Sequence, residues 1–395
     1  MSAYSALQKC LSLWRTASRL RQTMQLLIAS ELIAVFVLPR LVPGQWYFER
    51  YQSDARAALA VRSFFSADHC LLPDPQVGWL NRPGFFTSKT CGTDGHGSRS
   101  QQPFGVTREA GKARVMFLGS SMVNGGAYVN GTETISAYAA TSTVETLNFG
   151  TMLYRIDQSY IAYKVHLAKF DPDIVIVGVD EYADSPVSNV WIPLVSRTEV
   201  NLPFVKPRFR LIDGEIVAEL APLDLLRMSA KDPLPLLSYV AQHDDLYFVF
   251  DDAKRFGLTP IAHTLNYVYR TTQRMNLRWV DGPPSRGEQL TLSILEHFRD
   301  ELHKQRKKLI LLLLPRSDAI GNKPWKSDYR SHQRMRELLA ARGLFYVDAV
   351  DALRKLPVTA GFGTDGIHYS PKGNRAIAEQ LAPFLSSQPE MSGAR

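Results

Sequence analysis

Two spacings of apolar residues alternate along most of the chain. Short apolar runs typical of buried strands lie at Arg114–Leu118, Val144–Asn148, Asp173–Gly178 and Lys308–Leu314, with a weaker run at Leu344–Asp348. Between them, Ile156–Lys169 and Leu290–Lys307 have apolar residues at helical spacing. Buried strands that alternate with helices predict a parallel sheet with crossover helices, and therefore an α/β fold.

The regions outside this alternation divide the rest of the chain. Residues 45–112 contain a helical stretch, Ser53–Phe65, and a segment rich in turn residues, Leu72–Val106, which we interpret as an N-terminal extension packed on the main domain. The main domain spans 113–388. Residues 190–284 contain prolines and aromatic residues without a strand–helix rhythm, and we interpret them as an insertion that forms a lid or a substrate-facing subdomain.

Residues 1–44 predict a cytoplasmic tail and a membrane anchor. The apolar stretch Met24–Leu38 follows four basic and no acidic residues, a pattern that keeps the N-terminus in the cytoplasm and sends the rest of the chain across the membrane. No small-residue cleavage site follows the stretch. Glu31 opposes insertion by about 2.5–3.5 kcal/mol. The alternative is an amphipathic helix on the membrane surface or on the protein.

Composition narrows the range of functions. The chain has 395 residues, of which 45% are hydrophobic and 21% charged, as in an ordinary globular protein. The formal charge of +8 is a mild excess, and without a nucleic-acid-binding motif we expect no nucleic-acid partner. Cys70 and Cys91 flank a loop-like segment and could form a disulfide in an oxidising compartment, a question that the sequence leaves open. No Cys-x-x-Cys pair or histidine spacing suggests a metal, and no cofactor is implied.

Chemically useful residues follow the first two predicted strands, where parallel sheets bind ligands. The turn Gly119-Ser120-Ser121 comes after the first strand and would expose the Ser121 hydroxyl at the start of a helix, although such serines are commonly only helix caps. Gly150 follows the second strand. Its amide could donate to an oxyanion, or it could simply be a turn glycine.

An Asp-x-x-His motif lies near the C-terminus. Asp365 precedes His368 by three residues, in a turn before a helix that runs through Leu381. A carboxylate at this spacing can hold the imidazole in one tautomer and leave its other nitrogen free to act on a hydroxyl. A lone histidine is more often structural, but together with Ser121 the motif gives the Ser–His–Asp arrangement in a different chain order.

These motifs resemble the blocks of the SGNH/GDSL hydrolase superfamily. Gly119-Ser120-Ser121 is similar to its first block, Gly150 to its second and Asp365-x-x-His368 to its last, and Asp74–Trp79 resembles the lead-in of membrane-anchored bacterial members. The resemblance covers about residues 70–385. It implies a three-layer, flavodoxin-like parallel sheet with flanking helices. It also implies a Ser121 nucleophile, an Asp365–His368 acid–base pair, and oxyanion donors at the Ser121 and Gly150 amides.

The third block departs from the family pattern. The family usually has Gly-x-Asn-Asp after its third strand, where the Asn side chain donates to the oxyanion, but here the segment is Gly178-Val179-Asp180-Glu181. An ionised Asp180 cannot donate a hydrogen bond, and its charge opposes an oxyanion. Loss of one donor costs about 10²–10³ in rate, so the other donors could sustain activity.

The resulting expectation is a membrane-anchored, extracytoplasmic serine esterase. Its substrates would be acyl esters, foremost O-acetyl esters, of an envelope or extracellular glycan. One alternative is an O-acyltransferase in polysaccharide modification. A second is a catalytically impaired carbohydrate-binding or assembly protein, and a third is a lipase-like enzyme that acts on membrane lipids.

Overall fold

The structure is a computed structural model that describes residues 22–26, 29, 55–85, 92–100, 104–180, 187, 189–194, 203–244, 284, 286–321 and 327–385. Most of the predicted membrane anchor lies outside these residues. Within them, every helix is too short or too polar to cross a bilayer.

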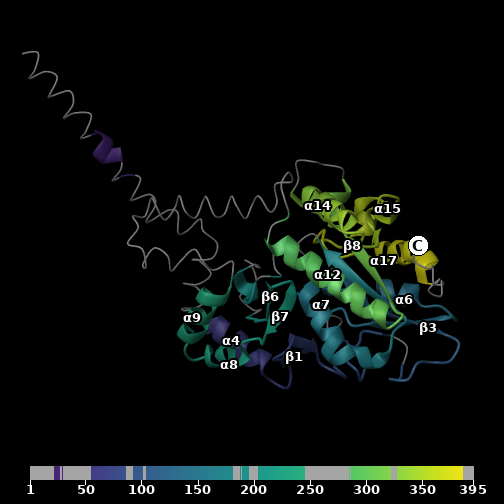
Figure 1. Ribbon diagram of the computed structural model, residues 1–395, viewed down its shortest axis with the longest axis horizontal. Helices are drawn as coiled ribbons and strands as arrows, with labels where there is room; N and C mark the ends of the chain where they lie inside the picture. The colour runs from purple at the N-terminus through teal and green to yellow at the C-terminus, as the bar shows by residue number, and fades with distance from the viewer. Residues whose placement is uncertain are drawn as a thin grey trace, which may run out of the picture.

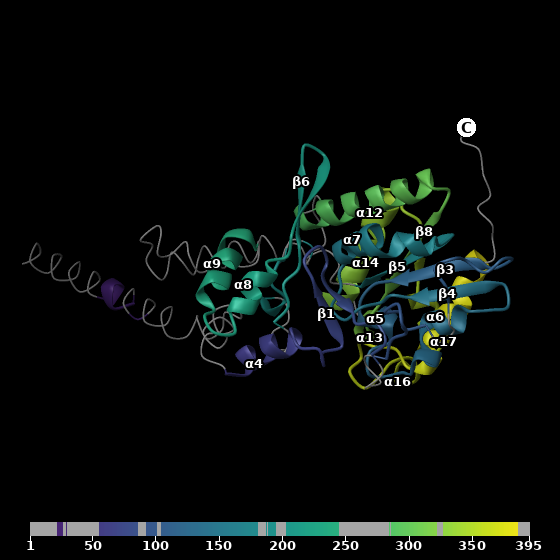
Figure 2. The same ribbon diagram turned by 90° about the horizontal axis from the view of Figure 1, so that it is seen from below.

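A five-stranded parallel sheet lies at the centre of the molecule (Figures 1 and 2). Its strand order is β4-β3-β5-β8-β9, formed by β3 (Ala113–Leu118), β4 (Val144–Asn148), β5 (Ile174–Asp180), β8 (Lys308–Leu314) and β9 (Tyr346–Asp348). In chain order this is 2-1-3-4-5, the flavodoxin-like order, so the predicted parallel sheet is confirmed. In that order β4 and β5 lie on opposite sides of β3, and open α/β sheets bind ligands at such a change in the direction of strand addition.

Helices cover both faces of the sheet because its strands are apolar on both sides. Val175, Val177 and Val179 face one core cluster, whereas Ile174 and Ile176 face the other. The first face is covered by α7 (Ile156–Ala162), α12 (Arg286–Lys304) and α14 (Ser327–Ala341). The second is covered by α5 (Ser121–Asn124), α6 (Ile135–Ala139), α13 (Ser317–Ile320), α15 (Val350–Leu353) and α17 (Pro371–Leu385).

Short helical turns complete the main domain. They are η1 (Gly131–Glu133), η2 (Tyr163–Leu167), η3 (Ala168–Phe170), η5 (Ile192–Leu194) and α16 (Val358–Gly361).

The N-terminal extension forms one helix and a small antiparallel hairpin. Helix α4 (Ala55–Phe64) precedes β1 (Leu71–Asp74), which pairs with β2 (Gly78–Asn81). The Asp74 carboxylate accepts hydrogen bonds from the amides of Gln76 and Val77, which closes the turn between the strands. The segment that the sequence presented as turn-rich therefore contains a regular hairpin.

The insertion is more regular than expected in the part that the structure describes. It contains the antiparallel strands β6 (Arg208–Ile212) and β7 (Glu215–Glu219), followed by α8 (Leu223–Met228) and α9 (Leu234–His243). The expectation of an irregular segment was wrong here. Asp213 and Gly214 both have positive φ, 51° and 85°, and form the two-residue turn that Asp-Gly favours between strands. Figure 2 shows α8 and α9 beside α4, at one end of the molecule.

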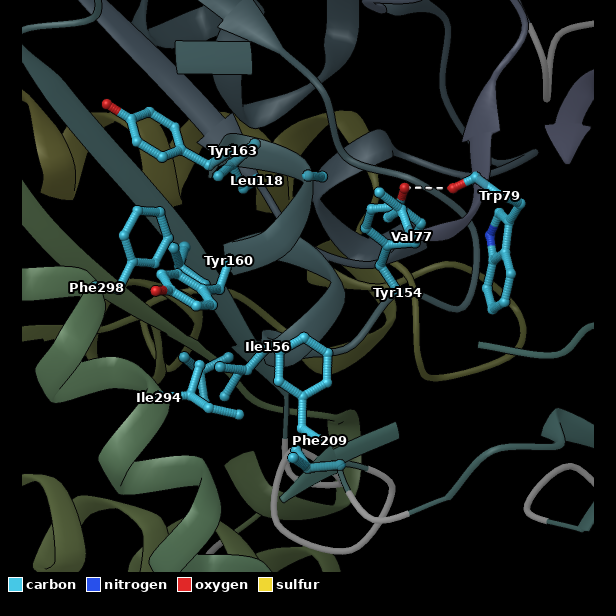
Figure 3. Packing of buried hydrophobic residues seen from close by; sticks show 14 of the residues in the cluster. Val77, Trp79, Leu118, Tyr154, Ile156, Tyr160, Tyr163, Phe209, Ile294 and Phe298 are labelled. Carbon is cyan, nitrogen blue, oxygen red and sulfur yellow. Dashed lines mark hydrogen bonds between the residues drawn. The ribbon is translucent and has the colours of Figure 1, made fainter. Parts of the chain in front are cut away.

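The extension, the insertion and the first face of the sheet share one hydrophobic core. The Phe204 ring lies 4.9 Å from Trp79 and 4.8 Å from Phe64, measured between ring centroids. Figure 3 shows Phe209 of β6 beside residues of α7, with Tyr160 and Phe298 in ring contact nearby. The described part of the insertion therefore packs on the hairpin and α7, and its aromatic residues Trp191, Phe204 and Phe209 are core residues. Tyr247 and Phe248 of the insertion lie outside the described residues.

Cys70 is disulfide-bonded. The chain has 3 cysteines, and the other two, Cys10 and Cys91, lie outside the described residues. The pairing of Cys70 with Cys91 therefore stays a prediction.

Candidate active site

Ser121 lies at the sharp turn between β3 and α5. Gly119 begins the turn with a φ of 143°, and Ser120 caps α5 by accepting a hydrogen bond from the Met122 amide. Ser120 thus has the capping role that the sequence also allowed for Ser121. Ser121 is the first residue of α5, and its amide donates no hydrogen bond to any other described residue. That amide can donate to a bound group.

The structure brings together the three side chains that the sequence singled out. Ser121 Oγ lies 2.8 Å from His368 Nε2, and His368 Nδ1 lies 2.6 Å from Asp365 Oδ2. With Nδ1 protonated and donating to Asp365, Nε2 accepts the proton of the Ser121 hydroxyl. This is the connectivity of a nucleophile, a general base and an orienting carboxylate.

The loop before α17 holds Asp365 in place. Its Oδ1 accepts hydrogen bonds from the amides of Ile367 and His368, at 3.0 and 3.1 Å. Burial raises the pKa of Asp365, but the hydrogen bonds from the His368 side chain and from these two amides outweigh it, so the pKa lies below its usual value. Asp365 is therefore ionised at neutral pH and can stabilise a protonated His368.

An aromatic ring lies against the imidazole. Tyr128 stacks on His368 with a centroid separation of 5.1 Å and an interplanar angle of 18°. A Cβ atom at Gly126 would lie 3.0 Å from the His368 ring, so the backbone of this loop also contacts the imidazole. Burial and the charge of Asp365 raise the pKa of Tyr128, so its hydroxyl stays protonated. The sequence gave no signal for Tyr128, because nothing in the pattern places the loop after α5 on His368.

Gly150 has a different role from the predicted one. Its amide donates to Asn148 Oδ1 at 3.0 Å and is not available to an oxyanion. A Cβ atom at this position would lie 2.5 Å from the Asn124 amide nitrogen, so the residue lets the end of β4 touch the backbone of α5. The expectation of an oxyanion donor at Gly150 is therefore corrected to a close-packing role. In the same loop, the amides of Met152 and Leu153 donate no hydrogen bond to any described residue.

The β1–β2 hairpin braces this loop. Trp79 Nε1 donates to the Met152 carbonyl at 2.9 Å, and Asn81 Nδ2 donates to the Gly150 carbonyl at 3.0 Å. The Tyr154 hydroxyl donates to the Trp79 carbonyl, the contact drawn as a dashed line in Figure 3. The N-terminal extension therefore fixes the segment that faces the nucleophile turn.

Arg99, also from the extension, fixes the other end of α5. Its guanidinium donates to Asn124 Oδ1 at 2.7 Å, to the Gly126 carbonyl at 3.0 Å and to the Val129 carbonyl at 2.7 Å. Burial lowers the pKa of Arg99 to about 10, which still leaves it charged at neutral pH. The one-turn helix that begins with Ser121 is thus held at both ends.

Asp180, at the end of β5, forms an ion pair. Its Oδ2 lies 3.2 Å from Arg155 Nη1, and each side chain is about one-eighth exposed, at 12%. The sequence did not single out Arg155, which lies 25 residues from Asp180 with no motif to link them.

Comparisons with known proteins give matches at low sequence identity. A scan against family models and a search of curated proteins found no match. A solved structure described as an acetylxylan esterase from Geobacillus stearothermophilus is 12% identical, with 71% of this chain and 97% of that chain covered and a TM-score of 0.37.

Two other solved structures match at a similar level. One is assigned to the G-D-S-L lipolytic family, from Desulfitobacterium hafniense, with 11% identity, coverage of 69% and 100%, and a TM-score of 0.36. The other is described as an alpha/beta hydrolase enzyme from the metagenome of Lake Arreo, Spain, with 13% identity, coverage of 71% and 99%, and a TM-score of 0.37.

Proposed function

We propose that the protein is a serine esterase of the SGNH type, with Ser121 as nucleophile, His368 as general base and Asp365 as the residue that orients His368. The observation that supports this most directly is the hydrogen-bonded chain from Ser121 Oγ through both ring nitrogens of His368 to Asp365. Neither contact is needed to cap a helix or fill a core, and together they leave the hydroxyl oxygen ready to attack.

The reaction begins when His368 Nε2 takes the Ser121 proton as Oγ attacks an acyl carbonyl. The Ser121 amide donates to the resulting oxyanion, and the unused amides of Met152 and Leu153 are the nearest candidates along the chain for a second donor. The protonated His368 then gives its proton to the leaving alkoxide, which leaves an acyl-enzyme. Water, activated by the same histidine, releases the acid and restores the serine.

The substrate class that we propose is acyl esters, foremost O-acetyl esters, of an envelope or extracellular glycan. Transfer of the acyl group to a sugar hydroxyl in place of water is the alternative within the same chemistry. The disulfide at Cys70 supports a location outside the cytoplasm, since disulfides persist in oxidising compartments. An anchor within residues 1–44 would hold the protein at the membrane.

A second candidate function is a non-catalytic carbohydrate-binding or assembly protein. It is favoured by one pair of observations: Asp180 cannot donate while ionised, and the Gly150 amide is already engaged. Two of the expected oxyanion donors are thus missing, each worth about 10²–10³ in rate.

Labelling with a fluorophosphonate probe tests the first proposal against the second. The full-length protein in mild detergent is treated with the probe beside Ser121→Ala and His368→Ala variants, and the labelled peptide is identified by mass spectrometry. Labelling at Ser121 that both substitutions abolish supports the esterase. A folded wild-type protein that does not label refutes it, and binding of acetylated and deacetylated glycans then becomes the assay.

A further inference from the structure

The end of β5 faces the nucleophile side of the sheet. The Cα of Gly178 lies 3.3 Å from a Cβ atom built on Gly119, and the position of a side chain at Gly178 is occupied by Val123 of α5. Side chains two residues apart on a strand point to the same face. Asp180, two residues after Gly178, therefore points toward the face of the sheet that carries α5 and Ser121.

Arg155 reaches this point from the opposite face. It is the residue immediately before α7, which packs on the other side of the sheet. The loop that leads to it is tied to the nucleophile turn, since the Thr151 amide donates to the Gly119 carbonyl at 2.8 Å. The 3.2 Å contact with Asp180, the last residue of β5, places the guanidinium at the carboxyl-terminal end of that strand.

The Arg155 guanidinium has N–H donors that are not used in its contact with Asp180. A guanidinium carries a positive charge and five N–H groups in a fixed plane. One donates to Asp180, and the buried Nε has no partner among the described residues. A positive charge with unused donors in a mostly buried setting stabilises a nearby developing negative charge more strongly than it would in water.

We propose that Arg155, oriented by Asp180, stabilises the oxyanion in place of the usual Asn. The inference rests on the proposed esterase function and assigns a residue to it. In this arrangement the Asp180 carboxylate does not oppose the oxyanion, because Arg155 neutralises it and presents its own donors to the reacting carbonyl oxygen.

A double-mutant cycle on the full-length protein separates this role from simple neutralisation of Asp180. The variants are Arg155→Met, Asp180→Asn and the double substitution, with Arg155→Gln as a second replacement in case the methionine variant does not fold. The readouts are the rate of fluorophosphonate labelling at Ser121, kcat and KM for p-nitrophenyl acetate, and the thermal midpoint of each variant.

We expect Arg155→Met to lower kcat and the labelling rate by about 10²–10³, with KM nearly unchanged, because the contact forms in the transition state. The decisive comparison is between two variants that both lack the carboxylate. Asp180→Asn, which keeps Arg155, should react at least about tenfold faster than the double variant, an advantage of about 1.4 kcal/mol.

Arg108→Met is the matched control. Arg108 pairs with Asp173, the residue immediately before β5, so its loss removes an Arg–Asp pair at the other end of this strand without touching the site. It should label at the wild-type rate.

Three outcomes overturn the proposal in distinguishable ways. Equal rates for Asp180→Asn and the double variant would mean that Arg155 only neutralises a carboxylate. A folded Arg155→Met or Arg155→Gln variant with the wild-type rate would exclude any role in the reaction. A wild-type protein that is folded and does not label would remove the esterase function itself, and the inference with it.

Discussion

Replacement of Gly150 by alanine should displace the nucleophile. The new Cβ would lie 2.5 Å from the Asn124 amide nitrogen and 2.9 Å from the Val123 carbonyl carbon, and ordinary contact begins near 3.4 Å. The gap must therefore widen by about 0.9 Å (3.4 minus 2.5). Both atoms are backbone of α5, so no side chain can move aside, and the shift is passed to Ser121, whose Oγ now lies 2.8 Å from His368 Nε2.

Two consequences of this shift can be measured. A misplacement of about 1 Å in a catalytic group can cost about 10²-fold in rate. Overpacking typically costs about 1–3 kcal/mol in the free energy of unfolding. We therefore expect Gly150→Ala to label with fluorophosphonate about 10²-fold more slowly and to unfold at lower urea concentration.

Gly95→Ala is the control, because a Cβ there meets no atom within 4 Å, and it should match the wild type in both assays. The reasoning is refuted if Gly150→Ala labels within about twofold of the wild-type rate with an unchanged unfolding free energy. Such a result would agree with the oxyanion-donor role that the sequence predicted for residue 150, because alanine keeps the backbone amide.

Three further substitutions probe the site and its support. Asp365→Asn should lower kcat for p-nitrophenyl acetate by about 10⁴. The pKa of Asp365 is lowered in the folded protein, so its support of His368 is present above about pH 4 and is lost only as the pH falls through that lowered pKa. An Asp365→Asn variant that kept the wild-type rate from pH 6 to 8 would contradict this role. Tyr128→Leu should reduce the labelling rate about twofold to fivefold, because the ring stacked on His368 stabilises the charged form of the imidazole by about 0.5–1 kcal/mol. Tyr128→Phe keeps the ring and should label at the wild-type rate. Equal rates for the two variants would exclude stacking as the cause of any change. Lys206→Met should lower the free energy of unfolding in urea by about 3–5 kcal/mol, because it leaves the buried Asp157 carboxylate without its partner. The double variant with Asp157→Leu should recover most of that loss. No recovery would mean that the pair does not act as a unit.

The sheet was predictable because its strands are buried on both faces. Continuous apolar runs locate such strands directly, and the predicted bounds of β4 and β8 are those of the structure. The β6–β7 hairpin was missed although Asp213-Gly214 is a recognisable turn signal, because the search was for strand–helix alternation. The short strands of the β1–β2 hairpin were missed for a different reason, because Pro73 and the nearby glycines made the segment resemble a series of turns.

The site was predictable only where sequence spacing fixes geometry. Asp365 and His368 are three residues apart, so one local turn brings them together. The contact between Tyr128 and His368 depends on how two distant loops pack, and the Arg155–Asp180 pair on how α7 meets β5. For Gly150 the sequence indicated an oxyanion donor or a turn glycine, but it could not indicate that this residue packs against the backbone of α5.

The hairpin that braces the loop after β4 determines what can be cut from this protein. Two of its side chains, Trp79 and Asn81, donate to carbonyls of that loop, and its backbone accepts from Tyr154. A shortened chain that began at β3 would contain the whole sheet and all three reacting side chains, yet it would leave these polar groups without partners and uncover the apolar face around Phe204. The extension is thus not a detachable segment. It is a structural component of the active site, so the smallest autonomous unit must begin before α4.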